Sequence, residues 1–322
     1  MSETRNLVIG CDGTWNEPQQ MSDGVPSPTN VVKFLRALKR LPGRQRHHYE
    51  KGVGSRAWES LPGGIYGYGL DKRVLGGYRF LRNCFADPKW ERGQNRVFII
   101  GFSRGAYTAR RLAGLVAHSG IPKNSADTEL GWEMYRERDL TTARALKREG
   151  RFFDTPIEMV GVWDTVKATN DPDYHDHVLS GNVVAGYHAM AIDERRKSFP
   201  VLHWKRDKRV LQTWFAGVHS DVGGGYANPG LSDIALNWML YRALHHGVQF
   251  KQSYVDEHVN PRPGAAIHSS FKGIWKPLGE NRRKILKTDF VHRSVAERLE
   301  KKARYRPENL PDDPRYWPPG DA

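Results

Sequence analysis

The residues with the clearest chemical pattern follow four apolar residues at 97–100 and read Gly101-Phe102-Ser103-Arg104-Gly105. This Gly-x-Ser-x-Gly spacing is typical of a nucleophile elbow, a tight strand-to-helix turn that projects the serine hydroxyl away from a sheet. Gly101 and Gly105 leave space where a Cβ would clash with the turn. The pattern predicts that Ser103 is a nucleophile and that the Arg104 amide, at a helix N-terminus, donates to a developing oxyanion.

A nucleophilic serine needs a base, and the base needs a carboxylate that orients it. Two later apolar segments lead into such residues, Asp164 and His219. Because α/β-hydrolases present nucleophile, acid and base in this order at strand ends, we expect Ser103, Asp164 and His219 to form a triad. Asp221, two residues after His219, is the alternative acid or a support for the glycine-rich loop that follows it.

An early apolar segment ends in Asp12-Gly13-Thr14. The amides of Gly13 and Thr14 are candidates for the second half of the oxyanion hole, and Asp12 is expected to be a buried polar anchor. The segment resembles the Asp-x-Asp-Gly-Thr nucleophile loop of haloacid-dehalogenase phosphatases, but Gly10 stands at the first aspartate position. The missing nucleophile disfavours a magnesium-dependent phosphotransferase.

Hydrophobic periodicity predicts the elements that position these residues. Strands alternate with helices, which indicates a mostly parallel central sheet with helices on both faces, and hence an α/β, α/β-hydrolase-like fold with a small helical cap insertion. The expected strands are Leu7–Cys11, His47–Gly52, Arg96–Gly101, Ile157–Trp163 and Gln212–Val218, and the expected helices are Val31–Leu41, Lys72–Phe85, Arg104–Gly120 and Ser232–His246.

Residues 1–250 are expected to form the catalytic domain. The helical insertion at about 122–155 is expected to cap the sheet and, with the aromatic loop Trp58–Tyr68, to supply an apolar acyl pocket. Residues 251–322 are basic and contain several prolines, so they are predicted to pack on the domain as an extension or to trail from it. The segment after His188, Asp193–Arg196, is predicted to be a salt-bridged structural element with His188 at helical spacing.

The composition is that of a globular protein, with 322 residues, 39% hydrophobic and 27% charged, and a formal net charge of +14. A positive field of this size attracts nucleic acid, anionic lipid or acidic substrates. The basic residues are dispersed and no nucleic-acid motif accompanies them, so nucleic acid is disfavoured as a partner. Attraction to an anionic membrane surface is more consistent with the predicted site.

Other features argue against metals, disulfides and membrane spans. Cys11 and Cys84 are too few for a disulfide framework and are expected to be buried thiols in a reducing compartment. His175, Asp176 and His177 would point to opposite faces of an extended segment, so neither a metal nor another cofactor is expected. We found no apolar run near the roughly 20 residues that span a bilayer and no Sec leader. We therefore expect a cytoplasmic protein and leave leaderless secretion open.

Five motifs, in order from about residue 5 to 250, resemble the bacterial and fungal family of α/β-hydrolase domains that includes the phospholipase effectors of type VI secretion. The resemblance implies the same triad of Ser103, Asp164 and His219. Ala216 departs from the family pattern, which has proline there, and this changes the stiffness of a turn more than the chemistry. The motifs are residues 12–16, 101–110, 161–166, 188–195 and 214–226.

The sequence thus predicts a serine hydrolase that cleaves carboxylic esters, with phospholipids or other lipids as substrates, through an acyl-enzyme. Two alternatives stay open. One is an esterase or thioesterase for small soluble acyl substrates, and the other is a catalytically silent binding protein on a hydrolase scaffold. The oligomeric state has no signature in the sequence.

Overall fold

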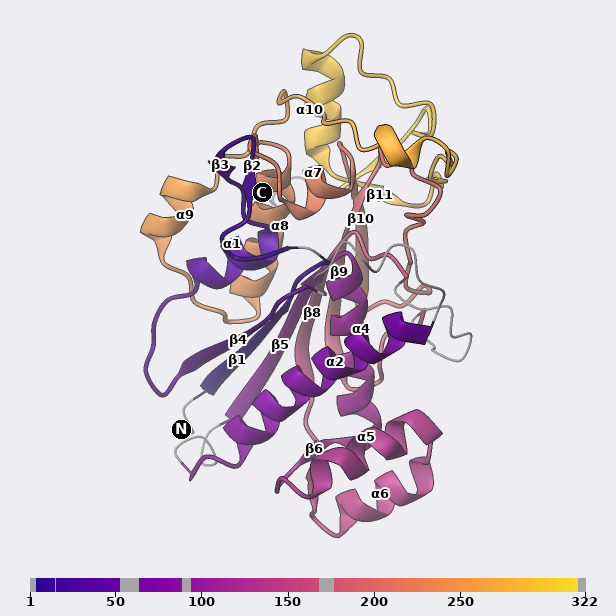
Figure 1. Cartoon of the computed structure of the whole chain (residues 1–322). Coiled ribbons are helices and arrows are strands. Elements are labelled where there is room, and N and C mark those ends of the chain that lie inside the picture. Colours follow the sequence, from indigo (N-terminus) through magenta and orange to yellow (C-terminus); the bar gives the residue numbers. More distant parts are fainter. Residues whose placement is uncertain (1–3, 15, 53–63, 89–93, 168–176, 318–322) are drawn as a thin grey trace.

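The computed structural model describes residues 4–14, 16–52, 64–88, 94–167 and 177–317 and centres on a parallel sheet (Figure 1). Its strands are β1 (Thr4–Cys11), β4 (Gln45–Glu50), β5 (Gln94–Phe102), β8 (Ile157–Trp163), β9 (Val183–Ala191), β10 (Val210–Phe215), β11 (Phe290–Val291) and β12 (Arg315–Tyr316). Their order across the sheet is β12-β11-β10-β9-β8-β5-β1-β4, and neighbouring strands are parallel throughout. The predicted α/β class with a mostly parallel sheet is confirmed.

Helices cover both faces of the sheet (Figure 1). On one face lie α2 (Gly64–Phe85) and α4 (Arg104–Ser119), and on the other lie α1 (Asn30–Ala37), α8 (Ser232–His245) and α9 (Gln252–His258). Side chains alternate along β1, so Leu7 and Ile9 belong to the first buried layer and Val8 belongs to the second. None of the described helices is both long and apolar enough to cross a bilayer.

One central strand, β9, was not predicted. It lies between β8 and β10 and carries His188, so the helical spacing assigned to His188 is wrong. The strand is buried on both faces over most of its length and therefore lacks a strict polar-apolar alternation. The predicted elements all occur, β8 with its expected bounds, but α2 begins at Gly64, eight residues before the expected Lys72, and α1 ends at Ala37, four residues before the expected Leu41.

The insertion expected to cap the site forms helices α5 (Asp127–Glu137) and α6 (Leu140–Arg148) between the strands of a short hairpin, β6 (Ile121–Pro122) and β7 (Phe152–Phe153). At the end of α4, the Ser119 hydroxyl donates to the Gly131 carbonyl of α5 at 2.7 Å. Because α4 starts beside Ser103, the insertion lies roughly 24 Å away, at the opposite end of that helix (Figure 1). The expectation that it supplies an acyl pocket is therefore wrong.

Residues after 250 extend the sheet instead of trailing from it. β11 pairs with β10 and β12 pairs with β11, and α10 (Arg293–Lys301) follows β11. Val291 and Val295 pack against Trp214 in a third buried cluster. This segment therefore contributes side chains to the hydrophobic core.

Three short elements complete the described chain: the hairpin of β2 (Met21–Ser22) and β3 (Val25–Pro26), α7 (His219–Gly223) and the 3₁₀ turn η2 (Gly273–Trp275).

The close contact between α4 and β1 predicts that a larger residue at position 105 destabilises the protein. A Cβ on Gly105 would lie 2.2 Å from the Cys11 carbonyl oxygen, a backbone atom that moves only if the strand or the helix moves. We expect Gly105→Ala to lower the free energy of unfolding by about 1–3 kcal/mol, as overpacking does. Urea unfolding measures this change. Gly181→Ala is the matched control because its Cβ would meet no atom within 4 Å, and equal midpoints for the two variants would contradict the prediction.

Candidate active site

The turn between β5 and α4 gives Ser103 an unusual backbone conformation. Its φ of 58° and ψ of −126° lie in a region that non-glycine residues rarely adopt. Strain of this kind is typical of functional turns, and here it turns the side chain out of the strand. Gly101 is required at the turn because a Cβ there would lie 2.5 Å from the Gly105 carbonyl oxygen. Ser103 therefore lies on a tight, strained turn between a strand and a helix.

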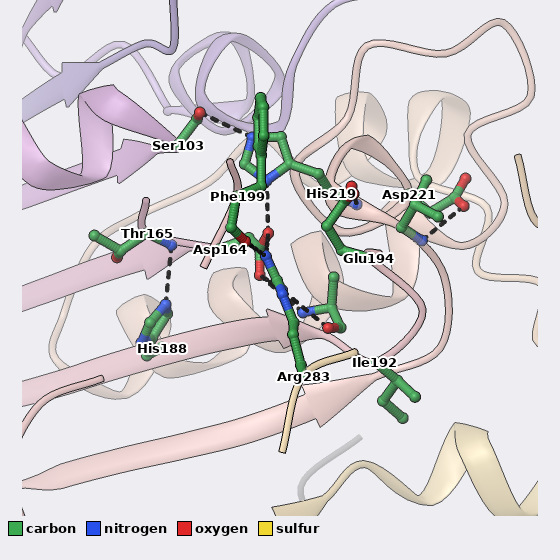
Figure 2. Close-up of polar contacts among 12 residues, drawn as sticks. Ser103, Asp164, Thr165, His188, Ile192, Glu194, Phe199, His219, Asp221 and Arg283 are labelled. Atoms are coloured by element: carbon green, nitrogen blue, oxygen red, sulfur yellow. Dashed lines mark hydrogen bonds and ion pairs between the residues drawn. The ribbon is translucent and has the colours of Figure 1, made fainter. Parts of the chain in front are cut away.

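Three side chains form a continuous hydrogen-bonded chain (Figure 2). The Ser103 Oγ lies 2.8 Å from the His219 Nε2, and the His219 Nδ1 lies 2.5 Å from the Asp164 Oδ2. Ser103 follows β5, Asp164 follows β8 and His219 begins α7 after β10, so the sheet brings the three together at the carboxyl ends of its strands. All three are at most 6% exposed.

Burial sets the protonation of His219. It lowers the pKa of the imidazole, and the nearby Asp164 carboxylate only partly offsets this. The ring is therefore neutral at neutral pH and can accept a proton at the nitrogen that faces the serine. The rings of Phe102 and Phe199 pack against it, with centroids 4.6 Å and 5.1 Å away.

Asp164 is fully buried but ionised. Burial would raise its pKa, but the Arg283 guanidinium and the His219 ring together hold that pKa below its ordinary value. Two nitrogens of Arg283 donate to the two carboxylate oxygens, at 2.5 Å and 2.9 Å, and the Ala191 amide donates at 2.9 Å. Nothing in the local sequence around residue 283 indicated this contact, because it joins residues 119 positions apart.

The alternative acid, Asp221, faces away from the His219 ring. Its carboxylate accepts the Val218 amide at 3.0 Å and the His268 amide at 3.1 Å, and lies 2.6 Å from the His268 Nδ1. Burial raises the pKa of Asp221, although these donors oppose the shift. Asp221 thus ties the loop at α7 to the C-terminal segment.

The Asp12-Gly13-Thr14 turn lies against the nucleophile. A Cβ on Gly13 would come within 3.0 Å of the Ser103 Cβ, which explains the glycine. Asp12 is buried and accepts bonds from the Thr29 hydroxyl at 2.7 Å and the Gly13 amide at 2.8 Å, and burial raises its pKa to about 6. The expectation that the Gly13 amide serves the oxyanion hole is wrong, because that N–H already donates to Asp12.

A pocket of about 520 Å³ opens beside Ser103 and His219. Its walls combine aromatic rings with cationic side chains, and Phe199, Lys272 and Trp275 among them lie outside every motif that the sequence analysis singled out. Arg196 packs its guanidinium over the Phe199 ring at 3.5 Å and pairs with Glu194 at 2.9 Å. The remaining lining residues are Thr14, Asn16, Phe102, Arg104, Ser220, Tyr226, Ser269, Ser270, Lys272, Gly273 and Trp275.

Two other parts of the sequence analysis bear on this pocket. The predicted salt-bridged element at 193–196 does contain an ion pair, Glu194 with Arg196, but it lies in the loop after β9, and Glu194 Oε2 also accepts the His219 amide at 3.2 Å. Burial opposes ionisation of Glu194, yet Arg196 lowers its pKa to about 2. Of the aromatic loop predicted at Trp58–Tyr68, residues 58–63 lie outside the described residues, and residues 64–68 belong to α2 instead of a loop.

His188 has a structural position below the site. It is buried, its Nε2 accepts the Thr165 amide at 3.1 Å, and burial lowers its pKa well below the usual range (Figure 2). A neutral His188 therefore supports the turn that follows Asp164.

Within the described ranges, no group of three or more histidine, cysteine or acidic side chains has the arrangement of a metal site. His175 and Asp176 lie outside those ranges. Cys11 and Cys84 are free and buried, and burial raises the pKa of both thiols. Neither thiol is therefore poised to act as a nucleophile.

The chain is similar to several known proteins. A crystal structure of an uncharacterized protein from Pseudomonas aeruginosa has a TM-score of 0.52 and 18% sequence identity, over 81% of this chain and 49% of the other. The Tle1 effector bound to the VgrG spike of the type 6 secretion system has a TM-score of 0.38 and 16% identity, over 70% of this chain and 52% of that one. An uncharacterized protein of Saccharomyces cerevisiae is 24% identical in an alignment of 235 residues that covers 62% of this chain and 33% of the yeast protein.

The chain thus spans about a third of the yeast protein and about half of the Pseudomonas chain. A family model described as the catalytic domain of Tle1-like phospholipase effectors of type VI secretion matches residues 5–242, from β1 into α8. The chain therefore belongs to the family of Tle1-like catalytic domains and has its hydrolase fold.

Proposed function

We propose that this chain is a serine hydrolase that cleaves carboxylic ester bonds through an acyl-enzyme. The observation that carries the proposal is the hydrogen-bonded chain from the Ser103 hydroxyl through His219 to Asp164, on a strained turn and beside an open pocket. A serine that merely caps a helix needs neither a buried imidazole nor a buried carboxylate behind it.

In the proposed first step, His219 Nε2 takes the Ser103 proton while Ser103 Oγ attacks the ester carbonyl carbon. The amides of Thr14 and Arg104 receive the negative charge on the carbonyl oxygen, because both residues line the pocket and Arg104 begins α4. The tetrahedral intermediate then collapses. The ester C–O bond breaks, and the leaving alcohol takes the proton from His219.

Water completes the cycle. His219 removes a proton from a water molecule, whose oxygen attacks the acyl carbon and displaces Ser103 Oγ, which recovers its proton from His219. Asp164 stays ionised in both steps, holds the imidazole in the required tautomer and stabilises its protonated form. The products are a carboxylic acid and free enzyme.

We propose a lipid ester with an anionic group as the substrate. The pocket combines apolar surface from Phe199, Tyr226 and Trp275 with the positive charge of Lys272 at its exposed edge. The +14 net charge would also draw the protein to an anionic bilayer. The family description names phospholipase effectors, which is consistent with this choice. The VgrG spike is a partner of the Tle1 effector in that complex.

Substrate preference tests this proposal. We expect hydrolysis of acyl esters to increase with chain length, and vesicles with anionic phospholipid to be hydrolysed faster than neutral ones. Lys272→Glu should raise KM for anionic vesicles by about 3-fold to 10-fold, because one nearby charge is reversed in water. Lys276→Glu is the matched control, since Lys276 is also exposed but is not among the residues that line the pocket. A preference for short soluble esters, with equal effects of both substitutions, would favour the small-substrate esterase instead.

A further inference from the structure

Arg283 contacts the buried carboxylate from a part of the chain beyond the residues matched by the family model. Its side chain is only 4% exposed, and the Asp164 side chain is fully buried. One guanidinium nitrogen bonds Asp164 and the Ala191 carbonyl, and the other bonds Asp164 and the Phe199 carbonyl, at 2.5–2.9 Å (Figure 2). Four acceptors thus fix the plane of the guanidinium.

The backbone of Arg283 is also held in place. Asn309 donates to the carbonyls of Arg283 and Ile192, each at 3.0 Å. Two residues before Arg283, the Asn281 amide donates to the Arg195 carbonyl at 2.8 Å. The C-terminal segment therefore presents Arg283 to the site as a fixed cation, and planar two-point pairing with a carboxylate is the geometry in which arginine differs from lysine.

On the basis of the function proposed above, we propose that Arg283 is a positioning residue that orients Asp164 toward His219 and limits how strongly this carboxylate stabilises the protonated ring. The carboxylate shares its charge between two cations when His219 is protonated. An Asp164 without Arg283 would give His219 its full negative potential. Arg283 would thus keep the base neutral, and active, at lower pH.

Other charged groups near His219 also affect the protonation of its ring. Glu194 accepts the His219 amide and favours the protonated ring, whereas Arg196 disfavours it. His188 and His203 interact electrostatically with Asp164, and Arg110 interacts with both of these rings. Of these groups, only Arg283 donates to both oxygens of the carboxylate that His219 contacts. A change at position 283 therefore acts directly on this carboxylate, although it also removes the bonds to the Ala191 and Phe199 carbonyls.

The test measures the pH dependence of hydrolysis and the titration of the His219 ring by NMR. We expect Arg283→Gln to move the acid limb of kcat/KM, and the NMR titration, upward by about one pH unit, and to lower kcat by about 10-fold. Arg283→Lys keeps the charge but loses the two-point contact, so it should lower kcat with little movement of the limb. Arg282→Gln is the matched control, because Arg282 is exposed and pairs with Glu308 instead.

Thermal unfolding shows whether each variant is folded. In the contrary outcome, Arg283→Gln lowers kcat equally at every pH while the acid limb of kcat/KM and the His219 titration stay where they are in the wild type. This result would overturn the proposal and make Arg283 a purely structural residue. If Arg283→Gln does not fold, Arg283→Lys decides, since an upward shift with the charge retained would overturn the proposed charge effect. The NMR titration needs no turnover. If the wild-type protein shows no activity, the serine-hydrolase proposal is contradicted. The effect of Arg283 on the pKa of His219 is still measured by the NMR titration.

Discussion

Replacing Ser103 with alanine should lower kcat/KM for ester hydrolysis by about 10⁴-fold to 10⁶-fold, because no acyl-enzyme then forms. Truncation of one hydroxyl in the pocket leaves the core untouched, so the unfolding midpoint should stay close to that of the wild type. The residual rate would come from the oxyanion amides and from substrate binding. Steady-state hydrolysis of a long-chain ester measures the loss.

Covalent labelling gives an independent measurement of the same prediction. A fluorophosphonate reacts at a useful rate only with an activated serine, so wild-type protein should be labelled at Ser103 and Ser103→Ala should not. Ser253→Ala, on the exposed surface of α9, is a control that should keep full labelling. Absence of both turnover and labelling in the wild type would instead support the catalytically silent binding protein.

Asp164→Asn should reduce kcat by about 10⁴-fold, because a neutral amide neither holds the required tautomer of His219 nor stabilises its protonated form. Stability should fall as well. The substitution leaves the Arg283 guanidinium buried opposite an uncharged group, and breaking one side of a buried ion pair costs about 3–5 kcal/mol. Urea unfolding and steady-state kinetics measure the two effects separately.

The double variant Asp164→Asn, Arg283→Gln separates these effects. Removing both charges should restore part of the lost stability, since no uncompensated ion is left in the core. Activity should stay as low as in Asp164→Asn, because the imidazole still lacks its carboxylate. Asp221→Asn serves as a comparison, since its carboxylate faces Val218 and His268. A larger loss of kcat in Asp221→Asn than in Asp164→Asn would make Asp221 the working acid.

Local patterns carried much of the prediction. The apolar run before Gly101 predicted β5, the helical spacing after Ser103 predicted α4, and the apolar run before Asp164 predicted β8 with its observed bounds. These are short-range preferences, which neighbouring residues express directly. β9 was missed because Gly186, Tyr187 and His188 interrupt its apolar run, and its central place in the sheet depends on strands that precede and follow it.

Long-range contacts set the limit on prediction from sequence. The helices at 127–148 were predicted, but their place at the far end of α4 follows from how α4 packs. The sequence made the Gly13 amide a reasonable candidate for the oxyanion hole, but in the folded chain this amide donates to the Asp12 carboxylate. In each case the sequence pattern indicated the kind of element or group, and tertiary contacts determined its partner.

The sequence by itself determined the parallel α/β architecture and three chemically suited residues at strand ends, Ser103, Asp164 and His219, because periodicity and turn chemistry are local. Only the tertiary structure decided which carboxylate contacts the imidazole and which cation contacts that carboxylate. Asp164 lies 55 positions from His219 and 119 from Arg283. Contacts over such separations depend on strand order and on the return of the C-terminal segment to the sheet, which no local pattern encodes.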